Sequence, residues 1–91
     1  MYVISVAANL AGVHPHTLRI YEEEGLLQPV RTSTNIRLYS EEDVQRVRCI
    51  RYLTQRRRVN LAGVKIILQL RSMEELLEAL VDELGAEAGA L

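Results

Sequence analysis

The chain has 91 residues, 48% of them hydrophobic and 25% charged, which is the size and composition of one small globular domain. Its formal net charge of −1 is unevenly divided: residues 1–60 carry nine Lys and Arg against six Asp and Glu, whereas residues 61–91 carry two against six. The lack of a long apolar run excludes a membrane-spanning helix and the single Cys49 excludes an internal disulfide, so we expect a cytoplasmic protein with a basic first part.

The first predicted helix begins at Ser5, whose side chain can cap it, and ends at Gly12. Val6, Leu10 and the alanines are expected to form its apolar side. Ala8 is small enough to let a second helix approach closely, and a glycine can make the turn between the two. These features are typical of the first half of a helix-turn-helix.

The second predicted helix starts at Pro15, because the missing N–H of proline costs nothing in a first helical turn. It is expected to run to Glu24 and to stop at Gly25. Leu18 would fill the seam between the two helices. The pattern predicts a helix-turn-helix, although a plain helical hairpin would share it.

Two short β-type segments, residues 27–30 and 36–39, flank a polar tip at residues 32–35 and predict a hairpin. Strand alternation would place Arg37 and Tyr39 on the same face of this hairpin. A helix-turn-helix followed by a hairpin and further helices is a winged arrangement.

Three more helices are expected after the hairpin. Ser40 is followed by three acidic residues, which is a strong helix start, and the arginines 56–58 suit the negative end of the same helix. Asn60 can cap a fourth helix, and Ser72 with Glu75 can form a capping box for a fifth. The fifth helix carries a coiled-coil-like apolar stripe. Its members are Met73, Leu77, Leu80 and Leu84.

Two segments, TLRIYEEEGLL (17–27) and IRLYSEEDV (36–44), resemble the MerR family of bacterial transcription regulators. Within it, YVISVAANLAGVHPHTLRIYEEEGLL with RVNLAGVKIIL is similar to the heat-shock repressor branch, HspR. The resemblance covers about residues 2–70. It implies a mainly α fold: a MerR-like winged helix-turn-helix with a small two-stranded wing in residues 1–70, and a short C-terminal dimerisation helix in residues 71–91.

The resemblance also implies a DNA interface on the second helix and the wing. Arg19 matches the arginine of the family's T-L-R-x-Y motif, and its guanidinium can fork onto guanine or onto a phosphate. Alternatively, Arg19 could pair with Glu22 or Glu23 within its own helix. The expected DNA-binding residues are His16, Thr17, Arg19, Tyr21, Arg31, Thr32, Asn35, Arg37, Tyr39 and Arg58. For Tyr21 and Tyr39, a packing role is an open alternative.

The sequence departs from the family pattern at two turns. Asn35 and Ile36 occupy the wing tip, where the family usually has Gly followed by an aromatic residue or Thr. Asparagine tolerates a positive φ, so the turn can survive. Arg58 stands where a glycine usually ends the third helix, and it would be strained if its φ is positive.

Expected partners also follow from the resemblance. The apolar stripe of the fifth helix would form a homodimer, which would bind double-stranded DNA at an inverted repeat, with DnaK as a possible co-repressor. Metal- and redox-sensing relatives use cysteines near and beyond that helix, and drug-sensing relatives append a domain. This sequence has only the upstream Cys49 and no such domain, so neither an inducer site nor a cofactor is expected.

Two other interpretations compete with a dimeric repressor. The first is an excisionase-like or architectural winged-helix module that binds DNA without dimer-dependent repression. The second is a metal-binding module or metal-dependent enzyme built on His14, His16 and Glu22. Two histidines two residues apart on a helix diverge by about 200°, so they cannot share a metal unless His14 precedes the helix. No nucleophile–base pair or phosphate loop is apparent, so no catalytic site is predicted.

Overall fold

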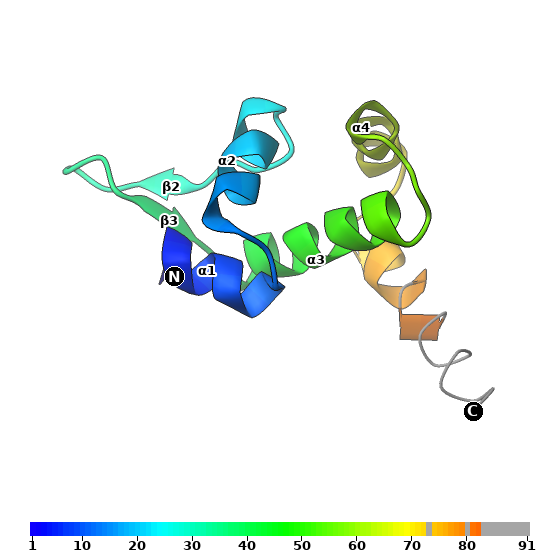
Figure 1. Ribbon diagram of the computed structural model, residues 1–91, viewed down its shortest axis with the longest axis horizontal. Helices are drawn as coiled ribbons and strands as arrows, with labels where there is room; N and C mark the ends of the chain where they lie inside the picture. The colour runs from blue at the N-terminus through cyan, green and yellow to red at the C-terminus, as the bar shows by residue number, and fades with distance from the viewer. Residues whose placement is uncertain (73, 80, 83–91) are drawn as a thin grey trace. The chain divides into compact units, whose positions relative to one another are not determined.

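The computed structural model describes residues 1–72, 74–79 and 81–82 and shows a mainly α-helical chain with one small sheet (Figure 1). The elements are β1 (Tyr2–Val3), α1 (Ile4–Ala11), α2 (Pro15–Glu23), β2 (Val30–Arg31), β3 (Arg37–Tyr39), α3 (Glu41–Gln55) and α4 (Leu61–Leu70). Residues 74–79 and 81–82 are also helical. The chain divides into two compact units, residues 1–48 and the part from Cys49 onward, and α3 begins in the first and ends in the second.

The sheet of the first unit is antiparallel, in the order β1-β3-β2. The predicted two-stranded wing is confirmed as β2 and β3, where Val30 pairs with Leu38. β2 begins only after Pro29, which has no N–H to donate to a ladder, and β3 begins one residue later than expected. The sequence did not predict β1, whose Tyr2 pairs with Tyr39.

The start of α1 differs from the prediction. Val3 is the N-cap and contributes no side-chain hydrogen bond, and Ser5 lies inside the helix. The predicted apolar side is confirmed for the alanines but wrong for Val6 and Leu10, which are 44% and 39% exposed. The buried face consists of Ala7, Ala8 and Ala11. The small alanine side chains let α1 pack closely against α2, and that contact selects the face with the least side-chain volume.

The turn and the second helix follow the predicted helix-turn-helix. Gly12 ends α1 in the left-handed conformation, with φ 71°, and Pro15 occupies the first turn of α2. Leu18 is fully buried, as a seam residue should be. After α2, Gly25 has φ 76°, so the glycine stop is confirmed as well.

In the first unit, the start of α3 directly after the wing is capped by hydrogen bonds between side chains and backbone N–H groups. The N–H of Ser40 donates to Asp43 Oδ2 at 2.8 Å, and the N–H of Asp43 donates back to Ser40 Oγ at 3.0 Å. This reciprocal pair satisfies helix-end donors and confirms the predicted start of α3. Arg46 Nε donates to the carbonyl oxygen of Leu26 at 2.7 Å and so ties α3 to the segment that leaves α2.

The second unit also shows its predicted caps. Asn60 Oδ1 accepts from the N–H of Gly63 at 2.8 Å at the start of α4. Ser72 Oγ accepts from the N–H of Glu75 at 3.2 Å and begins the last described helix. Of the predicted dimerisation stripe, Leu77 is half-buried, whereas Met73, Leu80 and Leu84 lie outside the described residues. In the part of the chain that the structure describes, every helix is too short or too polar to span a membrane.

Candidate nucleic-acid interface

The first turns of α2 present polar side chains to solvent. His16 and Arg19 are exposed and Thr17 is half-buried. Among the described residues, Arg19 has no hydrogen-bond or ion-pair partner, so the alternative pairing with Glu22 or Glu23 is not made. Its guanidinium is therefore available to a ligand, and it lies about one turn after the N-terminus of α2, which is the positive end of the helix dipole.

The acidic end of α2 is joined to the wing by ion pairs. Glu22 Oε2 accepts from Arg37 Nε at 2.6 Å, and Glu22 Oε1 accepts from Arg31 Nη2 at 3.0 Å. Burial raises the pKa of Glu22, but the hydrogen bonds and charges of Arg37 and Arg31 outweigh that effect, so the pKa lies below its ordinary value. The carboxylate is thus held in its charged form between two wing arginines.

The wing tip is closed by its own polar groups. Arg31 Nη1 donates to Asn35 Oδ1 at 3.1 Å, and Thr32 Oγ1 accepts from the N–H of Ile36 at 3.1 Å. Asn35 has φ 64°, so asparagine does take the left-handed position that glycine usually fills in this pattern. The predicted contact residues of the tip therefore lie together, and part of their hydrogen-bonding capacity is used internally.

The two predicted tyrosines lie in the core of the first unit. Tyr21 is 6% and Tyr39 1% exposed, a placement that matches the packing alternative for both. The Tyr39 hydroxyl is buried, and no described residue is its hydrogen-bond partner. Burial and, after it, the charge of Glu22 raise its pKa, against the opposing charges of Arg37, Arg19 and Arg31. The charges of α2 and of the wing thus act on this buried hydroxyl.

Arg58 belongs to the second unit, in the loop between α3 and α4. Its φ is 54°, which is the strained conformation anticipated for a non-glycine residue at this turn. Its side chain is exposed. A phosphate contact by Arg58 stays a prediction.

Sequence reasoning did not identify Glu22 as the residue that joins α2 to the wing. The sequence suggested Glu22 as a possible partner of Arg19 within the same helix and as a possible ligand of the competing metal site. The residue lies 15 positions from Arg37 and 9 from Arg31. No local pattern marks such a separation, and only the run of three glutamates in front of a basic hairpin gave a signal.

Two of the three groups of the competing metal site, His14 and Glu22, are engaged elsewhere. His14 is the N-cap of α2, and its Nδ1 accepts from the N–H of His16 at 3.0 Å. The carboxylate of Glu22 is occupied by arginines. Within residues 1–72, 74–79 and 81–82, no three His, Cys, Asp or Glu side chains gather as metal ligands would.

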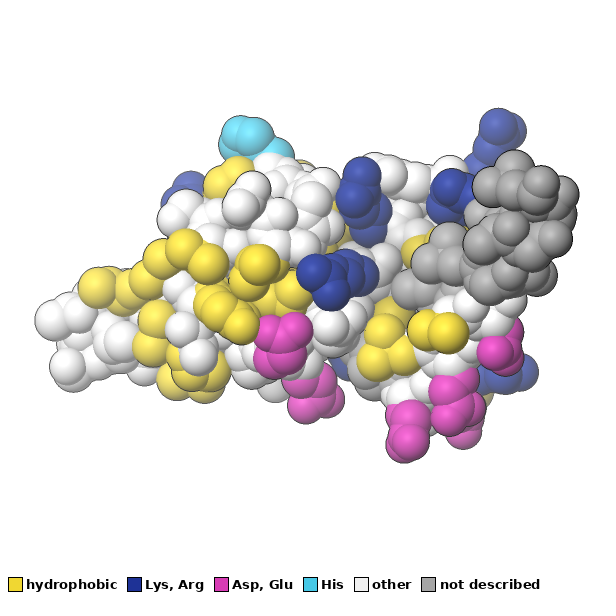
Figure 2. Space-filling model, turned by 90° about the horizontal axis from the view of Figure 1, so that it is seen from below, with side chains coloured by type: hydrophobic (Ala, Val, Ile, Leu, Met, Phe, Trp, Pro, Cys, Tyr) yellow, Lys and Arg dark blue, Asp and Glu magenta, His cyan; other side chains and the backbone are white. Residues whose placement is uncertain are grey.

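Another face of the first unit is apolar rather than charged. In the left half of Figure 2, which holds the wing and α1, hydrophobic side chains gather on the surface. The exposed apolar residues of this unit are Met1, Val3, Val6, Leu10, Val30 and Ile36. A polyanion gains little from such a surface, so the candidate interface is limited to the start of α2 and the wing arginines.

A helix-turn-helix followed by an antiparallel wing, with an exposed arginine on the second helix, defines a winged-helix DNA-binding regulator. The family model described as MerR HTH family regulatory protein matches residues 2–71. The chain therefore belongs to the MerR family, whose members are transcription regulators and not enzymes.

Known relatives agree with this assignment. The chain is 45% identical over 86 residues to a Streptomyces coelicolor protein assigned as heat shock protein HspR, covering 94% of this chain and 57% of that protein. It is 36% identical over 83 residues to the transcriptional regulator ZntR of Escherichia coli, covering 90% and 52%. The chain thus spans little more than half the length of these relatives.

A solved transcription regulator has a similar fold. The transcription regulator PbrR691 of Ralstonia metallidurans, determined in complex with lead(II), superimposes with a TM-score of 0.71 at 28% identity. The match covers 99% of this chain and 77% of that one. The predicted MerR-like winged helix-turn-helix is thereby confirmed.

Proposed function

We propose that this chain is a heat-shock-type repressor that binds an inverted-repeat operator as a homodimer. The observation that carries the proposal is the free guanidinium of Arg19 on the exposed start of α2, next to a wing that carries Arg31 and Arg37. The 45% identity to HspR across 94% of the chain supports the heat-shock assignment.

The geometry suggests a division of labour between the two parts of the interface. The start of α2 would enter the major groove, where Arg19 can donate two hydrogen bonds to guanine O6 and N7 and His16 can reach a base edge. Arg31 and Arg37 would lie on the flanking phosphates, which set affinity and register but carry no base information. Tyr21 and Tyr39 support the two parts from the core.

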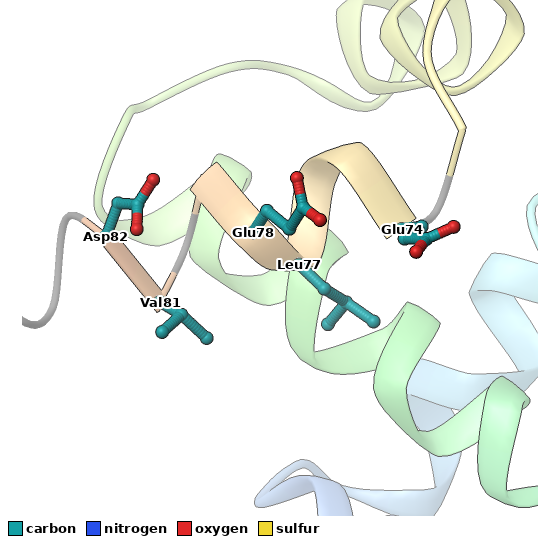
Figure 3. Close-up of a pocket in the computed structure, with 5 residues that line it drawn as sticks. All are labelled: Glu74, Leu77, Glu78, Val81 and Asp82. Atoms are coloured by element: carbon teal, nitrogen blue, oxygen red, sulfur yellow. The ribbon is translucent and has the colours of Figure 1, made fainter.

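The helical residues 74–79 and 81–82 support the homodimer. The side chains of Leu77 and Val81 point to the same side, whereas the carboxylates of Glu78 and Asp82 point away from it (Figure 3). Val81 is 66% exposed, so this apolar side is open to a partner. A two-fold dimer would bind half-sites roughly 34–36 Å apart or a multiple of that distance.

The proposal is tested by selecting duplexes from a random-sequence pool and measuring their affinity by fluorescence anisotropy across a salt series. We expect an inverted repeat, two chains per duplex and an affinity for a scrambled duplex at least 10³-fold weaker, in the usual range of specific regulators. Equal, steeply salt-dependent binding to both duplexes would leave a DNA-binding module without the operator. No binding at low salt would remove the DNA proposal.

The dimer is tested separately with Leu77→Asp and a matched control, Glu78→Gln, at the neighbouring exposed position. We expect Leu77→Asp to sediment as a monomer and to lose operator affinity, and Glu78→Gln to behave as the parent chain. Unchanged mass and affinity for Leu77→Asp would instead favour the excisionase-like or architectural module. If DnaK acts as co-repressor, its addition should tighten operator binding in the same titration.

A further inference from the structure

One carboxylate organises both arginines of the wing. Glu22 lies near the end of α2, while Arg31 ends β2 and Arg37 begins β3. Its two oxygens are used by different partners, Oε2 by Arg37 at 2.6 Å and Oε1 by Arg31 at 3.0 Å. The three side chains are 22%, 30% and 39% exposed for Glu22, Arg37 and Arg31, so they are partly shielded from water.

These contacts fix the direction of the two guanidinium groups. Arg37 is held through Nε, and Arg31 through Nη2, while Arg31 Nη1 also donates to Asn35. A guanidinium has five N–H donors, so each arginine keeps donors for a phosphate after these bonds are made. Because Glu22 is part of α2, the wing arginines are oriented with respect to the helix that would enter the major groove.

The same carboxylate lowers the positive charge that the wing offers to DNA. Two arginines with one glutamate present a net charge of +1 instead of +2. Sequence-independent affinity grows with the number of phosphates that are neutralised, whereas register depends on where the contacts lie. In a complex with DNA, Glu22 would therefore weaken binding to arbitrary DNA while it keeps the phosphate contacts in one register.

We propose that Glu22 is a specificity-determining residue that positions the wing arginines and suppresses binding to non-operator DNA. The inference rests on the proposed DNA-binding function. A purely structural ion pair would instead affect stability alone, and it would change operator and non-operator binding by the same factor.

The chain supplies a matched control at the next position. Glu23 is exposed, belongs to the same helix and has no ion-pair partner among the residues described. Glu22→Gln and Glu23→Gln remove the same charge from almost the same place, but only the first releases Arg31 and Arg37. A difference between the two variants therefore reports the contact with the wing, not the net charge.

The experiment measures the affinity of the parent chain and both variants for the selected inverted-repeat duplex and for a scrambled duplex of equal composition. For Glu22→Gln we expect the slope of log affinity against log salt on the scrambled duplex to steepen by about 0.9 for each newly engaged phosphate. One such contact corresponds to about a threefold gain in affinity over a fourfold decrease in salt. The ratio of operator to scrambled affinity should fall by at least that factor relative to Glu23→Gln.

Glu22→Asp keeps the charge but is one methylene too short to hold both arginines. We expect it to lose discrimination without steepening the salt slope, which separates positioning from charge. Identical affinity ratios for Glu22→Gln, Glu23→Gln and the parent chain would overturn the inference while leaving the proposed function intact. A parent chain that binds neither duplex would overturn both, and thermal unfolding of each variant verifies that it is folded.

Discussion

Arg31 donates a 3.1 Å hydrogen bond from Nη1 to Asn35 Oδ1, and this bond closes the wing tip between β2 and β3. Asn35 at the same time holds φ at 64°, and its N–H donates to the carbonyl oxygen of Thr32 at 2.9 Å. A glycine could supply the backbone conformation but not the side-chain bond. The asparagine therefore serves two purposes, turning the chain and restraining an arginine of the candidate interface.

The backbone role of Asn35 is separable from its side-chain role. Asn35→Gly and Asn35→Ala both remove the bond to Arg31, but only alanine meets the steric cost of the left-handed conformation, about 1–2 kcal/mol. Since glycine loses more conformational freedom on folding, we expect Asn35→Ala to be less stable than Asn35→Gly by about 1 kcal/mol. Denaturant unfolding of the two variants measures the difference, and equal stabilities would contradict it.

Arg58 is also in the left-handed conformation, at φ 54°, but its side chain does not tolerate a positive φ as asparagine does. We expect Arg58→Gly to raise the free energy of unfolding by about 0.5–1 kcal/mol, because the steric strain is removed and is only partly offset by chain entropy. Arg58→Ala is the control, since it removes the charge and keeps the strain. A gain of stability in Arg58→Ala as large as in Arg58→Gly would show that strain is not the cause.

The predicted features depend on residues that are close together in the sequence, whereas the missed features depend on residues that are far apart in it. The starts of α2, α3 and α4 were recognised because a cap acts within four residues, as in Asn60 with Gly63. The strand β1 has two residues, and Tyr2 pairs with Tyr39 on a strand that only the tertiary fold brings near. Similarly, Val6 and Leu10 were expected on the apolar face of α1 together with the alanines, because periodicity cannot reveal that close helix packing buries the alanines alone.

The candidate site was predictable in residue type rather than in geometry. The motif and its resemblance selected Arg19, Arg31 and Arg37, all of which have exposed or half-buried side chains. The same motif could not show that Tyr39 is buried or that Glu22 collects both wing arginines. Those properties depend on a contact between a helix and a hairpin, which local sequence patterns do not encode.

Arg19 is expected to contribute through the shape of its guanidinium as well as through its charge. Arg19→Ala should weaken operator binding by about 1–3 kcal/mol, and Arg19→Lys should recover little of that loss, because an ammonium cannot donate a planar pair of hydrogen bonds to guanine. The exposed side chain has no described partner, so unfolding should be unchanged. Anisotropy titrations against operator and scrambled duplexes measure the affinity of each variant. Full recovery of operator affinity by Arg19→Lys would indicate a phosphate contact instead of a guanine contact.

Because of its ion pairs, the contribution of Glu22 to the free energy of unfolding should decrease as the pH falls. The pKa of Glu22 is lowered in the folded chain from an ordinary value of 4.5, so the unfolded chain takes up the proton first as the pH falls. The stabilisation is complete above pH 4.5 and is lost as the pH falls through the lower pKa of the folded state. We expect the difference in unfolding free energy between the parent chain and Glu22→Gln to be constant near neutral pH and to narrow below 4.5.

Denaturant unfolding at a series of pH values measures this difference, and the arginines provide its control. When Arg31→Gln and Arg37→Gln are present in both chains, burial is the main remaining influence on Glu22, and burial raises its pKa. In that background the charged carboxylate destabilises the fold, so the unfolding free energy of the chain with Glu22, relative to that with Glu22→Gln, should rise as the pH is lowered toward 4.5. The same rise toward pH 4.5 in the chain with both arginines would mean that they do not hold the Glu22 carboxylate in its charged form.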